Sequence, residues 1–356
     1  MEPVTARASE PSSQQDSTRI GAGAPESDTA RRGTMKAAVR DRYGSPDVVE
    51  LRQIDRPVAG DGEVLVRVRA VSVNPADWYG LTGPFIARMA NGLRKPKSNR
   101  LGVDYAGTVE AVGRNVTQFR PGEEVFGARS GAFAEYVCAP EDRAVVPKPA
   151  NVTFEQAAAV PIAALTALQG LRDKGQIQAG QRVLINGASG GVGTFAVQIA
   201  KSFGAEVTGV CSTRNVEIVR SLGADHVIDY TREDFTRSDE RYNLLFDVAG
   251  SRSWSECKRV LDPHATLVIV GAPKGNRLIG PLGHIVKLRL ASVPSSQKAV
   301  FFIAKFNKAD MVVLRDLLEA GKVTPVIDRR YELSEIADAF RYLGEGHAQG
   351  KIVITV

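Results

Sequence analysis

The sequence has few cysteines and no long uninterrupted hydrophobic segment. Its three cysteines, Cys138, Cys211 and Cys257, are far apart and in no paired spacing, which favours neither a disulfide framework nor a structural zinc site. The longest apolar runs, such as residues 157–168, are too short and too interrupted by proline to cross a bilayer. We therefore expect no membrane span and a reducing compartment, the cytoplasm.

Clusters of basic residues are also missing. The 46 Lys and Arg residues against 40 Asp and Glu give a formal net charge of +6, but they are scattered, and no basic run is interleaved with aromatic residues. Nucleic acid is therefore not an expected partner. We interpret the excess positive charge as solvated surface that would attract an anionic cofactor.

Histidine is scarce as well. The four histidines, His226, His264, His284 and His347, match no metal-ligand spacing, so each is interpreted as a surface residue. No metal site is predicted from them.

The 356 residues, 43% of them hydrophobic, suffice for more than one core. Residues 1–34 are rich in Ser, Gly, Ala and charge without a hydrophobic period, which predicts a disordered tail. From Met35 to about Asn151, short alternating segments are broken by Gly, Pro and Asp. This pattern predicts an irregular, largely antiparallel, β-rich module.

After Thr153 the pattern changes to alternating helices and strands. The predicted elements are helix 154–174, strand 182–186, helix 193–204, strand 206–212, helix 215–224, strand 226–230, and apolar strands within 242–250 and 265–272. Such apolar, β-branched strands are typical of a buried parallel sheet, so a doubly wound α/β domain is predicted. Residues 311–356 return to helices followed by a strand, and we expect them to fold back on the first module.

The stretch 182–201, RVLINGASGGVGTFAVQIAK, places a glycine cluster between an apolar strand and a helix, the context that a dinucleotide-binding loop requires. Gly187 would permit the tight turn, Gly190 and Gly191 the close approach of a pyrophosphate, and Gly193 the packing of the helix on the sheet. The helix N-terminus would face the phosphates. A turn without a ligand is the alternative. The predicted cofactor cradle comprises Gly187, Ala188, Ser189, Gly190, Gly191, Val192 and Gly193.

The end of the next strand, residues 211–214, lacks the carboxylate that would accept hydrogen bonds from an NAD ribose. Glu206 has about the right spacing, but it would begin the strand, at the end remote from the ligand. The hydroxyls of Ser212 and Thr213 together with Arg214 suit a 2′-phosphate, because a guanidinium binds phosphate through paired hydrogen bonds. NADPH is therefore the predicted cofactor, and a merely solvated Arg214 is the alternative.

Two further sets of residues lie at the carboxyl ends of predicted parallel strands, where a dinucleotide would lie. We expect them to face the nicotinamide. The first set is Val248, Ala249 and Gly250, and the second is Val270, Gly271 and Ala272.

Several segments, in order, resemble the zinc-independent quinone oxidoreductase and zeta-crystallin branch of the medium-chain dehydrogenase/reductase superfamily: MKAAV, GEVLVRV, SVNPADW, GVDYAGTVEAVG, GAFAEYV, LTAL, GASGGVG, GADHVIDY and QGKIVIT. The resemblance covers nearly all of the chain after the tail. It implies an α/β protein with a GroES-like, β-rich catalytic domain, residues 35–158 completed by 299–356. A Rossmann NADP-binding domain of doubly wound parallel sheet, residues 159–298, would face it across a cleft.

The resemblance also implies properties that the residues alone do not. It places Tyr230 beside the 2′-phosphate and Thr166 near the cofactor, and it implies a homodimer. The zinc-dependent relatives have a Cys where this chain has Asn74 and a His-Glu pair where it has Val103 and Asp104. Because neither an amide nor a Val side chain replaces thiolate and imidazole at zinc, chemistry without a metal is expected.

Hydride added to an enone or quinone leaves a charge that the conjugated system spreads, so only hydrogen-bond donors and a proton are needed. The predicted activity is therefore an NADPH-dependent oxidoreductase acting on a quinone or an α,β-unsaturated ketone, a small electrophilic molecule. A zinc-free NADP-dependent alcohol dehydrogenase or carbonyl reductase, and a non-enzymatic NADPH-binding protein, remain open.

The predicted catalytic residues lie in the stretch VNPADWYG. Asn74 would hold the nicotinamide ribose or the acceptor oxygen, and Tyr79 would donate the proton. Asp77 is assigned with them, although a turn or helix cap explains it at least equally well. For Tyr79 the alternative is a wall of the cleft.

Overall fold

The structure, a computed structural model, describes residues 33–271 and 282–356, apart from the side chains of residues 86, 87 and 90. The predicted tail, residues 1–34, lies outside this part except for its last two residues. Thr34 already begins strand β1, so the tail prediction was one residue too long at that end. The described residues belong to one unit, 33–356.

The strands and helices within the described residues have the following bounds. The strands are β1 Thr34–Val39, β2 Glu50–Asp55, β3 Glu63–Val73, β4 Asp104–Val112, β5 Glu124–Ala128, β6 Tyr136–Pro140, β7 Val145–Pro147, β8 Arg182–Asn186, β9 Glu206–Cys211, β10 His226–Asp229, β11 Tyr242–Asp247, β12 Leu261–Ile269, β13 Lys298–Phe301, β14 Ile327–Glu332 and β15 Lys351–Thr355. The α-helices are α1 Pro75–Thr82, α2 Phe85–Asn91, α3 Phe154–Ala158, α4 Pro161–Gln169, α5 Gly191–Ser202, α6 Val216–Ser221, α7 Trp254–Lys258, α8 Leu282–Ser292, α9 Lys308–Glu319 and α10 Ile336–Glu345. Among these described helices, none has the length and apolar content needed to cross a bilayer.

The β-rich part contains a seven-stranded sheet in the order β14-β15-β3-β4-β5-β7, with β6 also paired to β3, and a separate pair of β1 and β2. In β3 the exposed Arg67 and Arg69 alternate with the buried Val66, Val68 and Ala70, as a strand with one solvated face should. The last strand, β15, pairs antiparallel with β3. The C-terminal segment therefore returns to the first module, as predicted.

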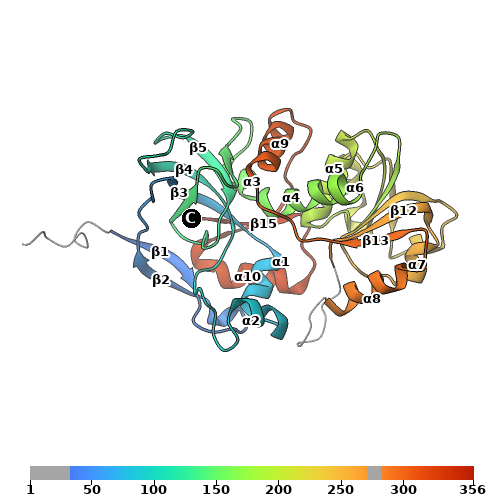
Figure 1. Cartoon of the computed structure of the whole chain (residues 1–356), viewed down its shortest axis with the longest axis horizontal. Helices are drawn as coiled ribbons and strands as arrows, with labels where there is room; N and C mark the ends of the chain where they lie inside the picture. Colours follow the sequence, from blue (N-terminus) through green and yellow to red (C-terminus); the bar gives the residue numbers. More distant parts are fainter. Residues whose placement is uncertain (1–32, 272–281) are drawn as a thin grey trace, which may run out of the picture. The chain divides into compact units, whose positions relative to one another are not determined.

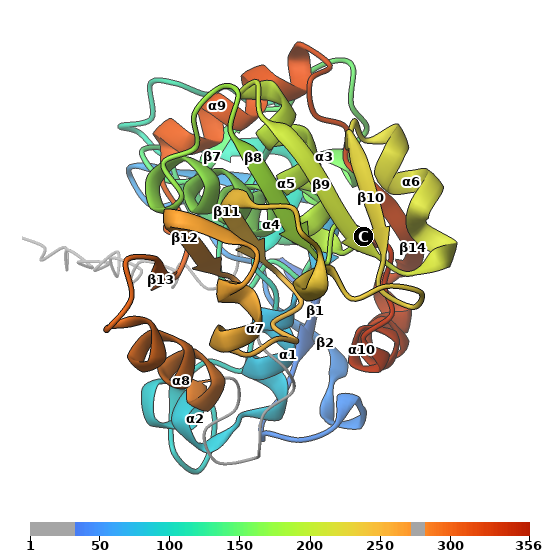
Figure 2. The same cartoon turned by 90° about the vertical axis from the view of Figure 1, so that its right-hand side faces the viewer.

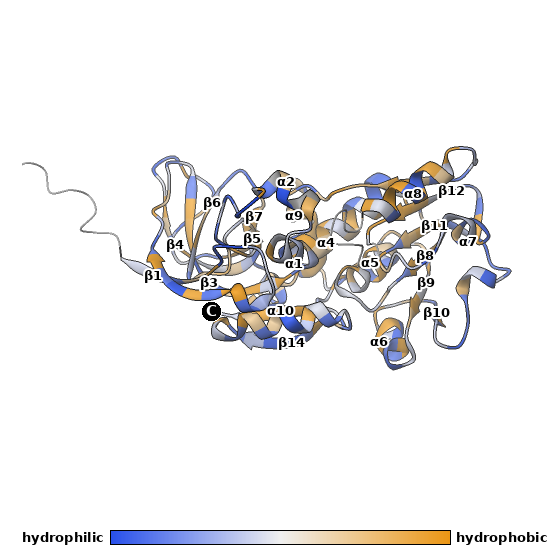
Figure 3. Ribbon diagram, turned by 90° about the horizontal axis from the view of Figure 1, so that it is seen from below, coloured by the Kyte–Doolittle hydropathy of each residue, from blue (hydrophilic) through white to orange (hydrophobic). Residues whose placement is uncertain are grey.

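The second sheet has six parallel strands in the order β10-β9-β8-β11-β12-β13, which confirms the doubly wound prediction. Successive residues of a strand point to opposite faces, and the core divides accordingly. Val183, Ile185 and Phe246 pack in the apolar cluster that contains α4 and α5. Leu184 and Leu245 pack in the cluster that contains α7 and α8. Figures 1 and 2 show these helices around the sheet, and Figure 3 shows hydrophobic residues along its strands.

The predicted helix 154–174 is not continuous. It is divided into α3, α4 and a π-helical segment, η3 Gly170–Lys174. Pro161 explains the first break, because proline lacks the N–H that would continue a helix but fits the first turn of a new one. The first expected domain boundary, after residue 158, falls between α3 and α4. The second, after residue 298, cuts β13, which belongs to the parallel sheet.

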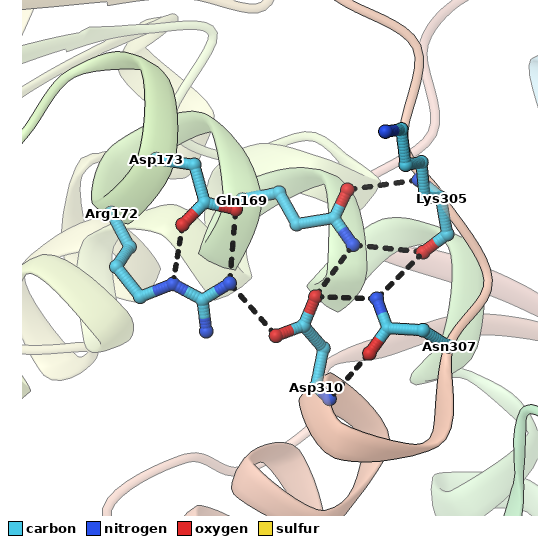
Figure 4. Close-up of polar contacts among 6 residues, drawn as sticks. All are labelled: Gln169, Arg172, Asp173, Lys305, Asn307 and Asp310. Carbon is cyan, nitrogen blue, oxygen red and sulfur yellow. Dashed lines mark hydrogen bonds and ion pairs between the residues drawn. The ribbon is translucent and has the colours of Figure 1, made fainter.

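A polar network ties the segment that leaves β13 to the π-helical segment (Figure 4). The Gln169 amide donates to the Lys305 carbonyl and to the Asp310 carboxylate, both at 2.8 Å, and it accepts from the Lys305 N–H at 2.9 Å. Arg172 pairs with Asp310 at 2.8 Å. This network fixes the path by which the chain passes from the parallel sheet back to the β-rich part.

Candidate active site

The glycine loop follows β8 directly, and α5 begins at Gly191. Gly187 has φ of +87°, a backbone conformation that favours glycine. No side chain caps the N-terminus of α5. Because the first N–H groups of a helix have no intrahelical acceptor, they are free to bind an anion at this end.

Steric contacts inside the loop fit a phosphate cradle. A Cβ on Gly193 would lie 2.0 Å from the Gly187 carbonyl oxygen, so the loop closes on itself only with glycine here. A Cβ on Gly190 would meet only that same oxygen, at 3.5 Å, which leaves room in front of this residue. Gly193 thus shapes the loop itself, and Gly190 leaves its backbone open to a ligand.

A cavity of about 580 Å³ opens in front of the loop at the carboxyl ends of the parallel strands. Eight of the predicted cofactor residues line it, namely Gly187, Ser189, Gly190, Ser212, Arg214, Tyr230, Val248 and Ala249. This is the place where an open α/β sheet binds a dinucleotide. The residues present therefore fit the predicted cofactor.

The residues predicted to bind the 2′-phosphate differ in their exposure and in their hydrogen bonds within the protein. Arg214 is exposed and donates through Nη2 to the His347 carbonyl at 2.9 Å. Tyr230 is 56% exposed. The Thr213 hydroxyl instead donates to the Asp229 carboxylate at 2.5 Å. The Asp229 carboxylate is therefore engaged within the protein. Arg214 lines the cavity together with Arg252, and Arg252 pairs with Asp234 at 3.2 Å.

The residues that follow β11 lie beside those that follow β12. The Val270 and Gly271 N–H groups both donate to the Asp247 carbonyl, at 2.9 and 3.1 Å, and a Cβ on Gly271 would lie 1.8 Å from the Val248 oxygen. The Gly250 N–H donates to the Asp247 carboxylate at 2.8 Å, and burial raises the pKa of that carboxyl to about 6. Ala272 lies outside the described residues.

The other predicted cofactor residues do not line the cavity. Ala188 is fully buried, and Val192 and Gly193 belong to the first turn of α5. Thr166 is half-buried, and its hydroxyl donates to the Ile162 carbonyl of its own helix at 2.7 Å. A contact of these residues with a cofactor remains a prediction.

The structure adds lining residues that the sequence did not reveal, including Asn215, Arg252 and His347. The Asn215 amide donates to the hydroxyls of Ser189 and Ser212, at 2.9 and 3.2 Å, and so joins the glycine loop to the segment that follows β9. Arg252 lies two residues after the predicted segment 248–250. Extending that segment by two residues would have included it. His347 comes from the segment before β15, and no local signal in the sequence points to it.

The predicted catalytic stretch belongs to a buried polar cluster. Asn74 is 1% exposed. Its Nδ2 donates to the Asp104 carboxylate at 2.9 Å and to the Ser72 carbonyl at 3.3 Å, and its Oδ1 accepts from Lys351. The Ser72 hydroxyl also donates to Asp104, at 2.9 Å. Both ends of the Asn74 amide are thus engaged by the protein, so the geometry gives no support to its predicted direct contact with ribose or acceptor.

Asp77 lies at the start of α1 as a cap, because its carboxylate accepts from the Asn74 N–H at 2.9 Å. This is the alternative that the sequence left open. Burial raises the pKa of Asp77 to about 7, with the nearby Asp104 acting in the same direction. Tyr79 is half-buried on the same helix, and burial raises the pKa of its phenol, which keeps the hydroxyl protonated.

The variant Asp77→Asn is expected to remove a pH dependence of stability. The folded pKa is raised from an ordinary value near 3.9, so ionisation of Asp77 costs stability. This cost is absent at low pH, grows between about pH 4 and pH 7, and stays constant above. Asn cannot ionise but keeps an oxygen for the Asn74 N–H. In urea unfolding, the wild type should lose about 2–4 kcal/mol more than the variant between pH 4 and pH 8.

The control for this variant is Asp61→Asn, an exposed carboxylate paired with Arg114 at 2.7 Å. It should leave the slope of unfolding free energy against pH unchanged, since exposed pairs contribute little. Equal slopes in the wild type and Asp77→Asn would contradict the raised pKa.

Metal ligands are not gathered at this site. Within residues 33–271 and 282–356, no group of three or more His, Cys, Asp or Glu side chains is arranged to hold a metal ion. Asn74 and Asp104 are joined instead through the Lys351 ammonium, whose Nζ is 3.7 Å from Asp104.

Comparisons with known proteins find dehydrogenase and oxidoreductase families. Residues 60–150 match the alcohol dehydrogenase GroES-like domain family, and residues 222–354 match the zinc-binding dehydrogenase family. The chain is 34% identical to the Mus musculus protein named NAD(P)H oxidoreductase RTN4IP1, mitochondrial, over 92% of this chain and 91% of that protein. It is also 34% identical to the Arabidopsis thaliana NADPH-dependent alkenal/one oxidoreductase, chloroplastic, over 90% and 79%.

A third relative is the 2-methylene-furan-3-one reductase of Solanum lycopersicum, 33% identical over 90% of this chain and 79% of that protein. Among solved structures, the quinone oxidoreductase from Coxiella burnetii superposes with a TM-score of 0.78 and 30% identity, covering 91% of this chain and 100% of that one.

Proposed function

Since the chain belongs to the medium-chain dehydrogenase/reductase superfamily, in the branch that contains the quinone oxidoreductases, we propose that it is an NADPH-dependent oxidoreductase. Its acceptor is a conjugated carbonyl compound, a quinone or an α,β-unsaturated ketone. The observation that supports this most directly is the cavity in front of the glycine loop, which has Arg214 in its wall. Two relatives named for alkenal/one and furanone reduction support the acceptor class.

The chain's own residues would divide the work of binding. The N-terminus of α5 and the open backbone at Gly190 bind the pyrophosphate, and Arg214 and Ser212 bind the 2′-phosphate. When bound, the cofactor supplies a hydride. Val248 and Ala249 line the cavity on the opposite side from Ser212 and Arg214 along the strand order, and they orient the nicotinamide end.

We assign the proton donation to Tyr79. Its phenol has an ordinary pKa of about 10, which burial raises further, so at physiological pH the hydroxyl is neutral and can donate to the anion left on a reduced enone or quinone. A conjugated acceptor suits the residues at this site. Asn74 and Val103 stand where zinc-dependent relatives have ligands, and neither side chain supplies a metal-binding thiolate or imidazole. We therefore propose that the reaction does not use a metal.

The test is oxidation of NADPH, with NADH in parallel, against a quinone, an enone and a saturated aldehyde. We expect turnover that prefers NADPH and the conjugated acceptors and that survives a chelator. Turnover restricted to saturated aldehydes would favour a zinc-free carbonyl reductase, and loss with the chelator would refute the metal-free reaction. Tight NADPH binding without any turnover would favour the non-enzymatic alternative.

We also propose a homodimer formed through β13. This strand ends the order of the parallel sheet within the described residues, and an edge strand presents unpaired backbone groups. The chain just beyond it exposes Ile303 and Phe306, 79% and 42% accessible. A monomer in sedimentation experiments at micromolar concentration would refute this proposal.

A cytoplasmic location is proposed from the three unpaired cysteines. Relatives are named as mitochondrial or chloroplastic, so cell fractionation has to separate these compartments.

A further inference from the structure

The buried cluster around Asn74 contains an ammonium group that the proposed chemistry does not use. Lys351 begins β15 and is only 3% exposed. Its Nζ donates to the Asn74 side-chain oxygen and to the Val73 carbonyl, the latter at 3.4 Å, and it lies 3.7 Å from the Asp104 carboxylate. A buried charge is retained only where partners of this kind surround it.

The stem of the same side chain lies against the cofactor loop. A Cβ added to Gly191, the first residue of α5, would be 3.2 Å from Lys351 Cδ. The preceding residue, Gly350, donates its N–H to the Ser189 carbonyl at 2.9 Å and forms a β-bridge with Gly190. Lys351 therefore contacts the predicted phosphate cradle with its stem and the start of α1 with its head.

The Lys351 ammonium is one of the groups that set the orientation of the Asn74 amide. Asn74 is the residue before α1, and its amide orientation is set on one side by Asp104 and on the other by Lys351. The same helix carries Trp78 and Tyr79. A shift of Lys351 therefore changes the hydrogen bond to the side chain of the residue that precedes α1.

We propose that Lys351 is a positioning residue that couples the cofactor cradle to α1. A cofactor that settles against Gly190 and Gly191 sets the position of the Lys351 stem, and the ammonium transmits that position to Asn74 and hence to the helix that carries Tyr79. The coupling rests on the cofactor binding proposed above. The ammonium does not touch cofactor or acceptor, because its polar atoms are buried and bonded within the cluster.

The chain provides its own reporter for this coupling. Its two tryptophans are Trp78 on α1 and Trp254 on α7, so a Trp254→Phe parent leaves Trp78 alone. The ligand is NADP⁺ rather than NADPH, because the oxidised form does not absorb the tryptophan emission. In this parent, we expect NADP⁺ to shift the Trp78 emission, while calorimetry measures binding independently.

In this parent, the test variant combines Lys351→Met with Asp104→Asn, which removes the Lys351–Asp104 pair as a whole and leaves neither of these two charges unpaired. We expect it still to bind NADP⁺ in calorimetry but to lose the emission shift. Lys308→Met is the matched control, because the Lys308 ammonium bonds to Gln118 and to the Glu141 carbonyl rather than to this cluster. The control should keep the shift.

Each other outcome is decisive. A shift that persists in the double variant would overturn the role of Lys351, and so would binding to the parent with no shift at all. Failure of the parent to bind NADP⁺ by calorimetry would instead refute the cofactor assignment, and the coupling with it. The single variant Lys351→Met would leave the buried Asp104 carboxylate without its cation, so the double variant is the one to compare with the parent.

Discussion

Gly193→Ala is expected to reduce the affinity for NADPH by about 100-fold or more. The added methyl group would lie 2.0 Å from the Gly187 oxygen and 2.8 Å from Ala188 atoms, and these are backbone atoms that cannot swing away. The loop must open by about an ångström to relieve the clash, and displacements of this size cost roughly 100-fold at a precisely shaped site. A fluorescence titration with NADPH measures the effect.

The same substitution should lower stability by about 1–3 kcal/mol, as overpacking does. Gly62→Ala is the control, since a Cβ at that position meets no atom within 4 Å; it should leave both NADPH affinity and unfolding free energy unchanged. Normal NADPH binding by Gly193→Ala would contradict the loop geometry described above.

Arg214→Glu is expected to weaken NADPH binding by about 100-fold and to leave NADH binding nearly unchanged. The guanidinium would make charge-assisted hydrogen bonds to the 2′-phosphate, each worth about 1.5–3 kcal/mol, and tenfold in affinity corresponds to about 1.4 kcal/mol. The new carboxylate repels the phosphate as well. Because NADH lacks that phosphate, the ratio of the two dissociation constants isolates this contact.

Arg220→Glu serves as the charge-matched control. Arg220 is 59% exposed and paired with Glu217 at 2.8 Å, and it does not line the cavity. It should leave the preference between NADPH and NADH within about twofold at physiological salt, since exposed charges are screened over about 8 Å. Equal losses for both cofactors in Arg214→Glu would mean that the residue only holds the 346–348 segment, through its bond to the His347 carbonyl.

The local parts of the site could be predicted because each lies within one short stretch of chain. Gly187 to Gly193 connect a strand to a helix without interruption, and Arg214 follows the next strand directly. For such segments, the hydrophobic pattern and the glycine positions determine the conformation. Asp77 shows the limit of prediction from short segments, because the same local sequence fits both a helix cap and a catalytic carboxylate.

Other parts depended on residues that meet only in the folded chain. His347 reaches the cavity from the segment before β15, far along the chain from the glycine loop. For Asn74 the sequence predicted a direct contact with the nicotinamide ribose or the acceptor oxygen. The partners that engage it, Asp104 and Lys351, come from β4 and β15.

The sequence alone determined the two kinds of sheet and the glycine loop between β8 and α5, and it predicted a phosphorylated cofactor, since strand alternation, glycine conformation and charge are properties of short segments. Only the tertiary structure revealed which partners engage the Asn74 side chain. The antiparallel register of β15 on β3, with Ile352 opposite Val73, brings a lysine from the end of the chain beneath α1. Burial there removes water from the ammonium and the carboxylates, so each must bond to the protein, and no short segment contains that information.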